Sequence, residues 1–435
     1  MLGAGLVTRP LVRYLLDHPD FEVEVADCIV SKAVKLIDNH PQGTASELNL
    51  KNEELLREKI STADLVISMV PFSFHPTVAK YCLEFKKDMV TASYVSDEMK
   101  NLDGEAKEAG ILILNEVGLD PGIDHMEAMR IIHDVEENRG QILGFTSFCG
   151  GLPAPEANTN PFGYKFSWSP IGVLLAGKNP AQYLKDGQEV FIPSEDLFDD
   201  YSIIEIEGLG EFEVYPNRNS LTYIQLYGIQ SSKTVLRGTL RNKGWCPTMK
   251  KMVELGLLDE EEKDWSGLNY QDFIRRLMSE PAEEDITKAL STNLNIDEDS
   301  DIIKRLEWLG LLSEDPLPMT KSSALDLLAD RMQAKLQYEE GERDMIILQH
   351  EFAASYPDGK KENITSSLID YGIPHGDSSM ARTVSLPVAI ASRLILEEKI
   401  KITGVHIPVL PEFYGPILQE LTEVGIAFKE KREEI

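Results

Sequence analysis

Two glycines, Gly3 and Gly5, stand directly before a helix-like run, and the acidic residue Asp27 follows about 20 residues later. A glycine permits a tight turn, and a second glycine two positions on lets the backbone approach a pyrophosphate without a Cβ in the way. Pro10 fits the first turn of the helix, whose free N–H groups would face the anion. The pattern favours a dinucleotide site, although Gly-x-Gly also occurs in ordinary strand–helix turns.

The aspartate of this pattern ends a strand-like alternation of Phe21, Val23 and Val25. A carboxylate at the end of the second strand is placed to accept hydrogen bonds from an adenosine ribose, and it repels a 2′-phosphate. We therefore predict NAD as the cofactor, with NADP as the alternative, because Lys32 and Lys35 lie nearby and offset part of the repulsion. The other interpretation of Asp27 is a strand-end carboxylate in water.

The pattern departs from the usual fingerprint in two ways. Thr8 replaces the third glycine, so we expect looser packing of helix against strand there. Only Met1 and Leu2 precede Gly3, so the first strand is nearly absent. We expect that upstream residues of that strand were lost from this sequence.

Strand-like and helix-like runs alternate through the first 120 residues. The expected strands are 64–71, 89–92 and 111–115, and the expected helices are 31–39, 53–62, 77–85 and 97–109. This alternation predicts a Rossmann-type, doubly wound parallel sheet, which binds ligands beyond the carboxyl ends of its strands. Those ends are Val70-Pro71, Ser93-Tyr94 and residues 117–122.

The pattern of apolar and polar residues changes after this segment. Strand-like runs at 142–151 and 201–228 predict a second α/β domain with a mixed or antiparallel sheet, and 248–335 is helical and acidic. Strands are expected again at 344–354 and near 363–370, then a helix over 385–397, a loop over 408–416, a last helix, and an edge strand of the first domain over 425–430. We predict a dinucleotide-binding domain (1–121 and 416–435), a substrate and dimerisation domain (122–247 and 336–415) and a helical insertion (248–335).

Composition narrows the classes of partner. The chain has 435 residues, 42% of them apolar and 27% charged, with a formal net charge of −30. This acidity disfavours nucleic acid and anionic membranes. The apolar runs are too short to cross a bilayer, and there is no secretion signal at the start. Four scattered cysteines and eight histidines show no ligand spacing, so we expect no metal, reduced thiols and a cytoplasmic location.

Several longer motifs closely resemble the saccharopine dehydrogenase family of the glutamate-forming type, nearly from end to end. These motifs are Thr91–Tyr94, Gly118–Met126, Cys149–Pro155, Tyr164–Pro170, Tyr215–Arg218, Leu236–Arg241 and Tyr414–Leu418. The resemblance implies a Rossmann domain, a substrate and dimer domain with a helical insertion, and a homodimer. It also implies oxidation of saccharopine, with water and a nicotinamide cofactor, to glutamate and 2-aminoadipate 6-semialdehyde, or the reverse condensation.

The resemblance also implies roles for individual residues. The residues implied for the cofactor are Ala4, Leu6, Val70, Ala92, Ser93, Leu119, Asp120 and Pro121; the glycine pattern adds Gly3, Gly5 and Asp27, and Val7, Cys28 and Trp168 are further candidates. Those implied for saccharopine are Ser93, Tyr94, Asp120, Arg218, Thr239, Leu240 and Arg241. Tyr94, Asp120 and Cys149 are the catalytic candidates.

Physical reasons exist for the arginines and for the strand-end residues. Arg218 and Arg241 carry planar forks that bind carboxylates with two hydrogen bonds, and Tyr94 and Asp120 lie at strand ends where the nicotinamide should lie. Each has an alternative. Arginines of an acidic protein pair with surface carboxylates, and Asp120 could belong to a simple turn.

Other candidates also have structural interpretations. Asp124 and His125 would cap and begin a helix, Cys149 could be a small buried side chain, and Trp168 could be a core residue. Two other functions remain open: a dehydrogenase of the carboxynorspermidine type, which the arginine motifs disfavour, and a catalytically silent assembly domain.

Overall fold

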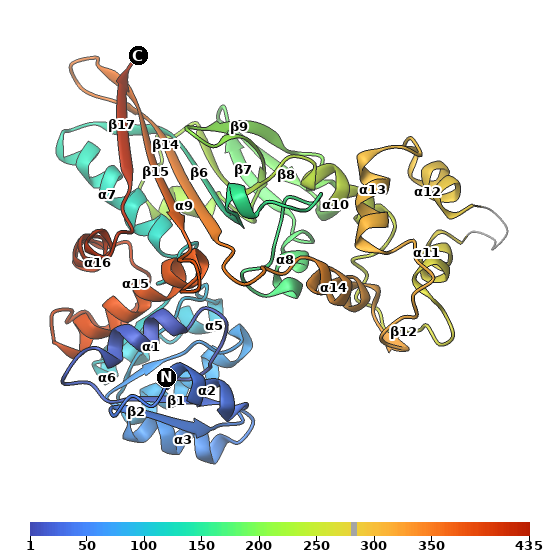
Figure 1. The fold of residues 1–435 in the computed structure, drawn as a ribbon. Helices are drawn as coiled ribbons and strands as arrows, with labels where there is room; N and C mark the ends of the chain where they lie inside the picture. The colour runs from blue at the N-terminus through green and yellow to red at the C-terminus, as the bar shows by residue number, and fades with distance from the viewer. Residues whose placement is uncertain (280–284) are drawn as a thin grey trace. The chain divides into compact units, whose positions relative to one another are not determined.

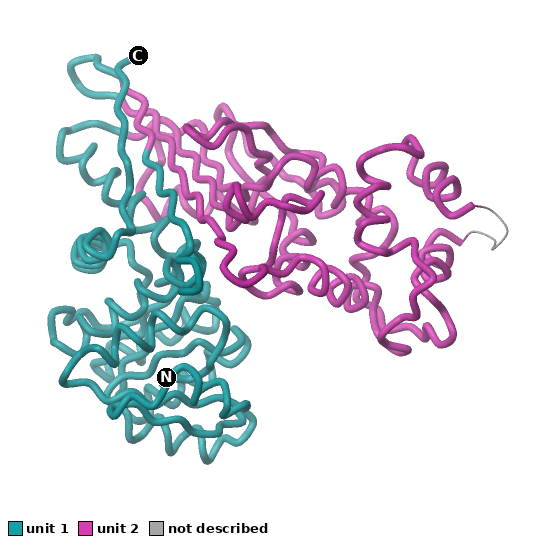
Figure 2. Tube along the Cα trace, viewed as in Figure 1, with its two compact units in different colours: residues 1–141, 355–361, 366–435 teal, residues 142–354, 362–365 magenta. Residues whose placement is uncertain are grey.

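The computed structural model describes residues 1–279 and 285–435 (Figure 1). The chain forms two compact units (Figure 2). Unit 1 comprises Met1–Gln141, Ser355–Lys361 and Ser366–Ile435, and unit 2 comprises Ile142–Ala354 and Glu362–Thr365. The three-part division given by the sequence stays a prediction, and its helical insertion includes residues 280–284, which lie outside the described residues.

Unit 1 contains a parallel sheet in the order β16-β5-β4-β3. Its strands are β3 (Leu65–Ile67), β4 (Asp88–Val90), β5 (Leu112–Leu114) and β16 (Gly404–His406). Beside it lie β1 (Val23–Asp27) and β2 (Gly43–Glu47), which also pair in parallel. Apolar side chains bury both faces of β5, as is usual for parallel strands between helices.

The two parts of this parallel arrangement are joined at Leu2. This residue forms parallel bridges with both Ala26 and Ser68. The Leu2 N–H donates to Ile67 O at 2.8 Å, and the Gly3 N–H donates to Ala26 O at 2.8 Å. Leu2 therefore occupies the centre of a doubly wound sheet, with β1 on one side and β3 on the other, and the predicted fold class is confirmed.

Helices cover both faces of the unit 1 sheet. Its helices are α1 (Arg9–Leu16), α2 (Val30–Ile37), α3 (Glu53–Thr62), α4 (His75–Phe85), α5 (Asp97–Lys100), α6 (Asp103–Ala109), α7 (Ile123–Glu137), α15 (Ser379–Leu396) and α16 (Pro411–Glu423). Helix α1 packs against α15 on one face (Figure 1), and α3 packs against α4 on the other. Buried residues of α3, α4 and α6, including Leu56, Val78 and Ala106, form one core with Leu2.

By length and composition, one helix of the described residues could span a membrane. This helix is α15, and 78% of the apolar window is buried inside the protein. Its contacts with α1, β3 and β4 explain why the sequence is so apolar: the helix lies in the core of unit 1.

The carboxyl-terminal segment differs from the sequence prediction. The edge strand expected over 425–430 is found as β17 (Lys429–Glu434) of unit 1, but it pairs with β15 at the edge of the large second sheet and not with the parallel sheet. The strand that joins the parallel sheet is β16 instead. All six side chains of β17 are charged and exposed, which suits an edge strand held by its main chain. Helix α16 also begins inside the predicted loop, at Pro411.

Unit 2 is built around a mixed sheet, as predicted. The path through the sheet is β17-β15-β14-β6-β11-β10-β9, with β7 paired to β11 and to β8; β17 and residues 366–371 of β15 belong to unit 1. The remaining strands are β6 (Gln141–Pro153), β7 (Ala181–Lys185), β8 (Gln188–Ile192), β9 (Ser202–Ile206), β10 (Gly210–Pro216), β11 (Thr234–Arg241), β14 (Asp344–Ser355) and β15 (Lys361–Tyr371). Strand β11 is parallel to β6 and antiparallel to β10. Short helices α8 (Pro170–Ala176) and α9 (Thr222–Leu226) lie between strands.

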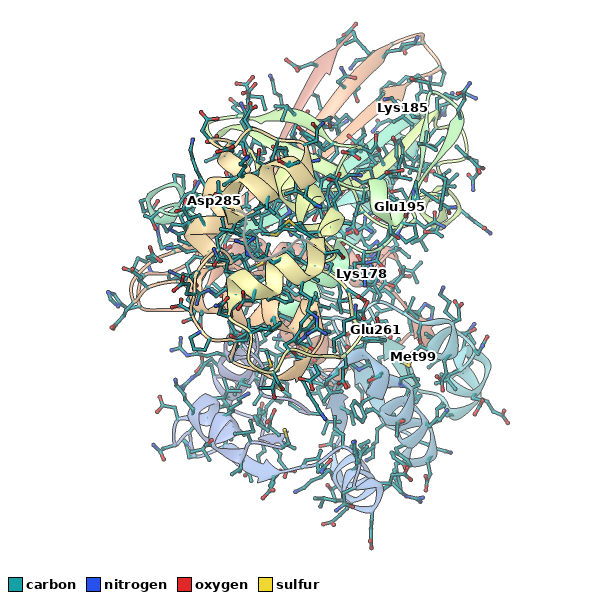
Figure 3. The ribbon with its side chains drawn as sticks, turned by 90° about the vertical axis from the view of Figure 1, so that its right-hand side faces the viewer. Met99, Lys178, Lys185, Glu195, Glu261 and Asp285 are labelled. Atoms are coloured by element: carbon teal, nitrogen blue, oxygen red, sulfur yellow. The ribbon has the colours of Figure 1, made fainter. Side chains whose placement is uncertain are left out.

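A helical region of unit 2 follows β11. It contains α10 (Trp245–Glu254), α11 (Tyr270–Met278), α12 (Ile286–Leu294), α13 (Asp301–Leu309), α14 (Ala324–Lys335) and the paired short strands β12 (Lys263–Asp264) and β13 (Lys321–Ser322). Several of these helices begin at a side chain that accepts a hydrogen bond from the first turn. For example, the carboxylate of Asp285, labelled in Figure 3, accepts the Thr287 N–H at 3.0 Å. The helical character predicted for 248–335 is confirmed for the described residues of this region.

Candidate active site

The glycine turn after Leu2 has the backbone geometry that the sequence predicts. Gly3 has φ +97°, and a Cβ at this position would lie 2.5 Å from Met69 O, so only glycine fits. No atom lies within 4 Å of a Cβ built on Gly5, which leaves open space for a ligand beside the backbone. Leu6 is 76% exposed beside that space. The turn has the geometry of a pyrophosphate site at the start of α1.

Thr8 takes a structural role in this turn. Its side chain is fully buried, and its Oγ1 donates to Gly5 O at 2.9 Å. Pro10 lies in the first turn of α1, as predicted. The hydroxyl thus closes the turn from inside, where the usual third glycine would leave a close approach of helix and strand.

Asp27 supports the glycine turn directly. Its Oδ2 accepts the Ala4 N–H at 2.7 Å, and its Oδ1 accepts the Ile29 N–H at 2.8 Å. The carboxylate therefore fixes the turn to the start of α2, a contact that the sequence did not suggest. Each oxygen has a further lone pair, so the ribose role stays a prediction. Cys28 is an exposed free thiol beside it.

The remaining candidates of unit 1 follow the parallel strands. Val70 comes after β3, Ala92, Ser93 and Tyr94 come after β4, and Leu119, Asp120 and Pro121 come after β5. Because the strands are parallel, their carboxyl ends meet at one edge, which also holds the turn after Leu2. We call this edge the carboxyl edge. Unit 1 thus brings together its predicted cofactor and catalytic residues.

Two catalytic candidates touch at this edge: the Tyr94 hydroxyl donates to Asp120 Oδ1 at 3.3 Å. Asp120 belongs to a tight turn in which the Gly118 N–H donates to Pro121 O, and the Asp120–Pro121 bond is cis. A Cβ on Gly122 would lie 2.0 Å from Gly118 O. The turn therefore presents the Asp120 side chain on a backbone with little freedom.

Three buried side chains, Glu116, Asp124 and His125, hold the segments around this pair. The Glu116 carboxylate accepts the Val95 N–H at 2.8 Å and lies 2.7 Å from His125 Nε2. Asp124 Oδ1 accepts the Gly122 N–H at 2.5 Å. The structural interpretation of Asp124 and His125 at the start of α7 thus agrees with these contacts. The sequence gave no signal for Glu116, because its partners come from two other segments.

His75 is a residue that the sequence analysis missed. It is the first residue of α4 and is 3% exposed. Its Nδ1 hydrogen-bonds with Ser68 Oγ at 2.9 Å, and its Nε2 hydrogen-bonds with Ser93 Oγ at 2.7 Å. Burial lowers the pKa of His75 to about 4, so the ring is neutral at physiological pH. Its place at the start of the helix that follows β3 was the only available signal.

Unit 2 places Cys149, Thr239, Leu240 and Arg241 on adjacent strands. Cys149 of β6 lies opposite Thr239 of β11 in the parallel register. The guanidinium of Arg241 lies 5.0 Å from the Tyr164 ring and 5.3 Å from the Trp245 ring. Arg241 is 5% exposed, and its Nη1 donates to Leu240 O at 2.8 Å. The expected alternative for this arginine, a surface ion pair, does not apply.

Three donors of this cluster have no hydrogen-bond partner among the described residues: Arg241 Nε, the Tyr164 hydroxyl and Trp245 Nε1. We call Arg241, Tyr164 and Trp245 the arginine cluster. Buried polar atoms without partners are rare in proteins, and here all three are donors. The cluster therefore has the chemistry to receive an acceptor such as a carboxylate.

Of the other two candidates of unit 2, Trp168 lies beside the Tyr164 hydroxyl of the arginine cluster. Arg218 follows β10 in a left-handed backbone conformation (φ 54°) and is exposed, and its carbonyl accepts the Gln182 N–H. Trp168 is half-buried and packs on Gly172 at the start of α8. Their predicted roles, and the meeting of the two groups of residues in one site, stay predictions.

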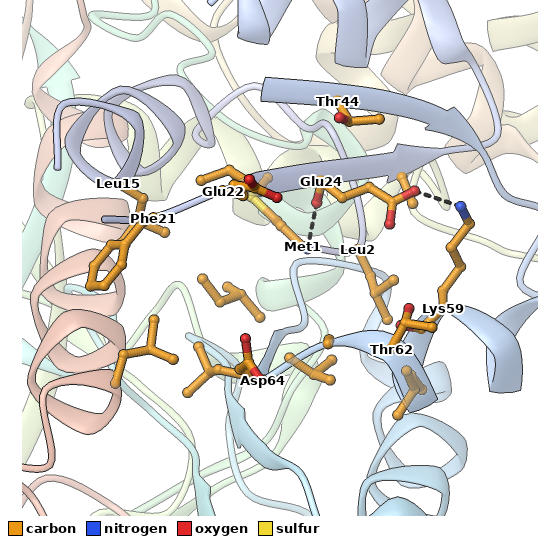
Figure 4. Close-up of a pocket in the computed structure, with 18 of the residues that line it drawn as sticks. Met1, Leu2, Leu15, Phe21, Glu22, Glu24, Thr44, Lys59, Thr62 and Asp64 are labelled. Atoms are coloured by element: carbon orange, nitrogen blue, oxygen red, sulfur yellow. Dashed lines mark hydrogen bonds and ion pairs between the residues drawn. The ribbon is translucent and has the colours of Figure 1, made fainter. Parts of the chain in front are cut away.

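A cavity of about 570 Å³ lies at the opposite edge of the unit 1 sheet (Figure 4). Its lining includes Met1, Phe21, Glu24, Asp64 and Leu65, which lie on the amino-terminal side of the bridges that Leu2 makes with Ala26 and Ser68. The Met1 ammonium donates to Glu24 O there at 2.7 Å. This cavity is separate from the carboxyl edge, where dinucleotides bind to such sheets.

Family models match both parts of the chain. Residues 1–114 match the saccharopine dehydrogenase NADP binding domain, and residues 118–426 match the saccharopine dehydrogenase C-terminal domain. The chain belongs to the saccharopine dehydrogenase family. The family assignment made from the motifs is thus confirmed, and with it the class of nicotinamide-dependent oxidoreductases.

Individual members of the saccharopine dehydrogenase family align over nearly the whole chain. The Saccharomyces cerevisiae saccharopine dehydrogenase [NADP(+), L-glutamate-forming] is 39% identical, over 99% of this chain and 98% of its own. The mitochondrial alpha-aminoadipic semialdehyde synthase of Bos taurus is 38% identical over 98% of this chain, which covers 47% of that protein.

Solved structures agree with this family assignment. The apo saccharopine dehydrogenase (L-Glu forming) of Saccharomyces cerevisiae matches with a TM-score of 0.91 and 38% identity, covering 99% of this chain and 98% of that one. Homospermidine synthase from Legionella pneumophila, solved with NAD, matches with a TM-score of 0.56 at 11% identity, which shows the fold alone. The polyamine-type alternative gains no support from this likeness. The names of the family model and of the yeast protein favour NADP, where Asp27 leads the sequence analysis to NAD.

Proposed function

We propose that this protein oxidises saccharopine, with NADP⁺ and water, to L-glutamate and 2-aminoadipate 6-semialdehyde, and that it also catalyses the reverse condensation. The proposal rests on the family and on two features that suit this chemistry. One is a dinucleotide turn at a sheet edge with a tyrosine and an aspartate, and the other is a buried cluster of unsatisfied donors. The reaction needs a hydride acceptor, sites for carboxylates and a group that takes a proton.

The residues of the carboxyl edge fit a dinucleotide. Gly3 has the backbone angle that the turn requires, and the space beside Gly5 is open. The first turn of α1 presents its N–H groups there, so the pyrophosphate would lie against Ala4, Leu6 and Val7. When bound, the nicotinamide supplies the acceptor for the hydride from the substrate carbon beside the secondary amine.

Tyr94 and Asp120 are the residues that we assign to proton movement. The substrate amine must lose a proton before its lone pair can assist departure of the hydride, and water then adds to the substrate imine. The Tyr94–Asp120 contact of 3.3 Å places a carboxylate and a phenol side by side for the first step. Cys149, 9% exposed in unit 2, is a second candidate for proton transfer during the addition of water.

The observation that carries the substrate assignment is the arginine cluster. Among residues 1–279 and 285–435, the buried guanidinium of Arg241 has no carboxylate partner, which is unusual in a chain with a net charge of −30 because an unpaired buried charge is costly. A substrate carboxylate would satisfy Arg241 Nε and the Tyr164 hydroxyl together. We assign Arg241 to one of the three substrate carboxylates and Arg218, which is exposed, to another.

For the cofactor, we propose NADP in preference to NAD. The Asp27 carboxylate accepts hydrogen bonds from the Ala4 and Ile29 N–H groups. These donors offset part of its negative charge and so reduce its repulsion of a 2′-phosphate. Helix α2 begins directly after Ile29, and Lys32 is an exposed residue of its first turn. A 2′-phosphate there would meet Lys32 and the free N–H groups of the helix start.

Measuring kcat/KM with both cofactors tests this preference. We expect at least a tenfold preference for NADP⁺, reduced several-fold in Lys32→Ala and unchanged in Lys86→Ala, a lysine at the other end of α4 from the carboxyl edge. A preference for NAD⁺ in the unaltered protein would contradict the assignment.

The predicted homodimer and cytoplasmic location complete the proposal. Sedimentation equilibrium at micromolar concentration tests the first, with a mass of twice 48.8 kDa expected. Fractionation of the source cells tests the second, and the mitochondrial relatives make it an informative measurement.

The function itself is tested by following absorbance at 340 nm with saccharopine and NADP⁺. Arg241→Lys should raise KM for saccharopine by roughly 10-fold to 100-fold, because a lysine cannot make the planar two-bond contact. Arg237→Lys is the matched control: Arg237 is a buried arginine of the same strand that stacks 4.4 Å from the Tyr223 ring. Absence of turnover by a protein that binds NADPH would contradict the proposal.

A further inference from the structure

Three hydroxyl side chains surround the imidazole of His75 at the carboxyl edge. Ser68 follows β3, and Thr91 and Ser93 follow β4. Ser68 Oγ lies 2.9 Å from Nδ1, Ser93 Oγ lies 2.7 Å from Nε2, and Thr91 Oγ1 lies 3.5 Å from Nε2. Ser68, His75 and Thr91 are at most 3% exposed, whereas Ser93 is partly exposed. The ring thus connects the protein interior to one hydroxyl at the edge.

The geometry fixes the Ser93 hydroxyl from two directions. Ser68 anchors the far side of the ring, so Nε2 cannot turn away from Ser93 without losing the Nδ1 contact. The main chain of Ser93 is held as well, since its N–H donates to Thr91 Oγ1 at 3.3 Å and its carbonyl accepts the Glu116 N–H at 3.1 Å. A serine hydroxyl normally rotates freely, and here one of its hydrogen-bonding directions is already taken.

We propose that His75 is a positioning residue, which orients the Ser93 hydroxyl so that it binds an oxygen of a ligand at the carboxyl edge. The inference rests on the proposed function, in which Ser93 faces cofactor and substrate. The bound group is a hydrogen-bonding oxygen, either the carboxamide oxygen of the nicotinamide or a substrate carboxylate. His75 itself is buried and reaches the ligand only through Ser93.

The low pKa of His75 agrees with this role. Burial lowers the pKa to about 4, so the ring keeps one N–H and one bare nitrogen over the working range. A charged ring would donate from both nitrogens and would force the Ser93 hydroxyl to accept from Nε2. A neutral ring keeps a fixed partner for each hydroxyl, and the hydroxyl direction does not change with pH above about 5.

A double-mutant cycle distinguishes positioning from a structural role. We compare His75→Ala, Ser93→Ala and the double variant by NADPH fluorescence titration, by KM and kcat for saccharopine, and by thermal midpoint. Each single variant should weaken one ligand about fivefold to tenfold, the size of one hydrogen bond. Because His75 acts through Ser93, the double variant should lose no more than Ser93→Ala alone, within twofold.

Two readouts identify which oxygen is bound. A weaker NADPH titration with unchanged saccharopine KM assigns the cofactor oxygen, and the reverse assigns the substrate carboxylate. The NADPH titration needs no turnover, so it remains decisive even if the chain does not oxidise saccharopine. If losses in the two single variants multiply in the double variant, or if only the thermal midpoint changes, the proposal is overturned.

Two further variants distinguish a loss of positioning from a folding defect. His75→Gln retains a donor and an acceptor, and it should recover affinity to within threefold of the unaltered protein. His133→Ala is the matched control: His133 of α7 also pairs with a hydroxyl, Tyr414 at 2.7 Å, but about two-thirds of the way along that helix from the carboxyl edge. It should lower the thermal midpoint without changing either ligand. Failure of His75→Gln to recover affinity while folded would also overturn the proposal.

Discussion

The glycine turn of unit 1 and the arginine cluster of unit 2 both have the chemistry to hold anions, and they are built in opposite ways. In the turn, the donors are main-chain N–H groups, and the shape depends on Gly3 and Gly5, which are neighbours in the chain. In the cluster, the donors are side chains of Tyr164, Arg241 and Trp245, which come from different segments. The comparison shows that a site made of main-chain groups is determined by a few residues close together in the sequence, whereas a site made of side chains depends on how distant segments pack.

The largest effect should come from Gly3→Val, which disrupts the glycine turn. Its φ of +97° disfavours a β-branched residue, and the new Cβ would lie 2.5 Å from Met69 O. We expect the free energy of unfolding to fall by roughly 4 kcal/mol, because conformational strain adds to the clash. Urea denaturation measures the change.

Gly5→Ala is the matched variant for the same turn. No atom lies within 4 Å of the added Cβ, so the urea midpoint should stay the same while NADPH binds at least tenfold more weakly. Unchanged affinity for NADPH would place the pyrophosphate elsewhere.

A second contrast concerns buried ionisable groups: His75 can remain neutral, whereas Arg241 cannot. The folded-state pKa of His75 is about 4, below the ordinary value of 6.5, so the unfolded chain binds a proton first as the pH falls. The contribution of His75 to stability is present above pH 6.5 and is lost between pH 6.5 and 4. Its size is roughly 3 kcal/mol.

The measurement is urea unfolding at pH 7 and at pH 4.5 for the unaltered protein and for His75→Gln. The unaltered protein should lose more stability than the variant over this range. Equal losses would mean that His75 is not buried as a neutral ring.

Arg241→Met should separate binding from stability. Removal of the guanidinium should raise KM for saccharopine at least tenfold, because a charge-assisted pair is lost. The corresponding loss of binding free energy is about 2 kcal/mol. The thermal midpoint should stay the same or rise, because an apolar side chain suits a buried position better than an unpaired charge. A large fall in the midpoint would show that the arginine cluster is structural, in contrast to our assignment.

The smallest effect is expected from Tyr164→Phe. The ring that stacks on Arg241 is kept, and only the unpartnered hydroxyl is removed. KM for saccharopine should rise about fivefold, with no loss of stability. Tyr227→Phe, a tyrosine of the same unit that packs on Phe145, is the control and should leave KM unchanged. Equal KM in Tyr164→Phe and the unaltered protein would remove Tyr164 from the substrate site.

Much of unit 1 could be predicted because its signals are local. The apolar run around Val66 and the alternation ending at Asp27 gave the strands, and the glycines gave the turn. The errors came where local signals fail. Strand β16 has one apolar side chain, Val405, whereas the equally short β3 and β5 are wholly apolar, and β17 consists of charged residues that pair through the main chain.

By itself, then, the sequence determined the family, the doubly wound sheet and the residues that end its strands, because periodicity and glycine geometry are properties of neighbouring residues. Only the tertiary structure decided that Asp27 accepts the Ala4 N–H, that His75 contacts Ser93, and that Arg241 lies buried with no carboxylate partner in the described part of the chain. The physical reason is that burial and hydrogen-bond partners depend on which distant segments pack together, and no spacing along the chain encodes that directly.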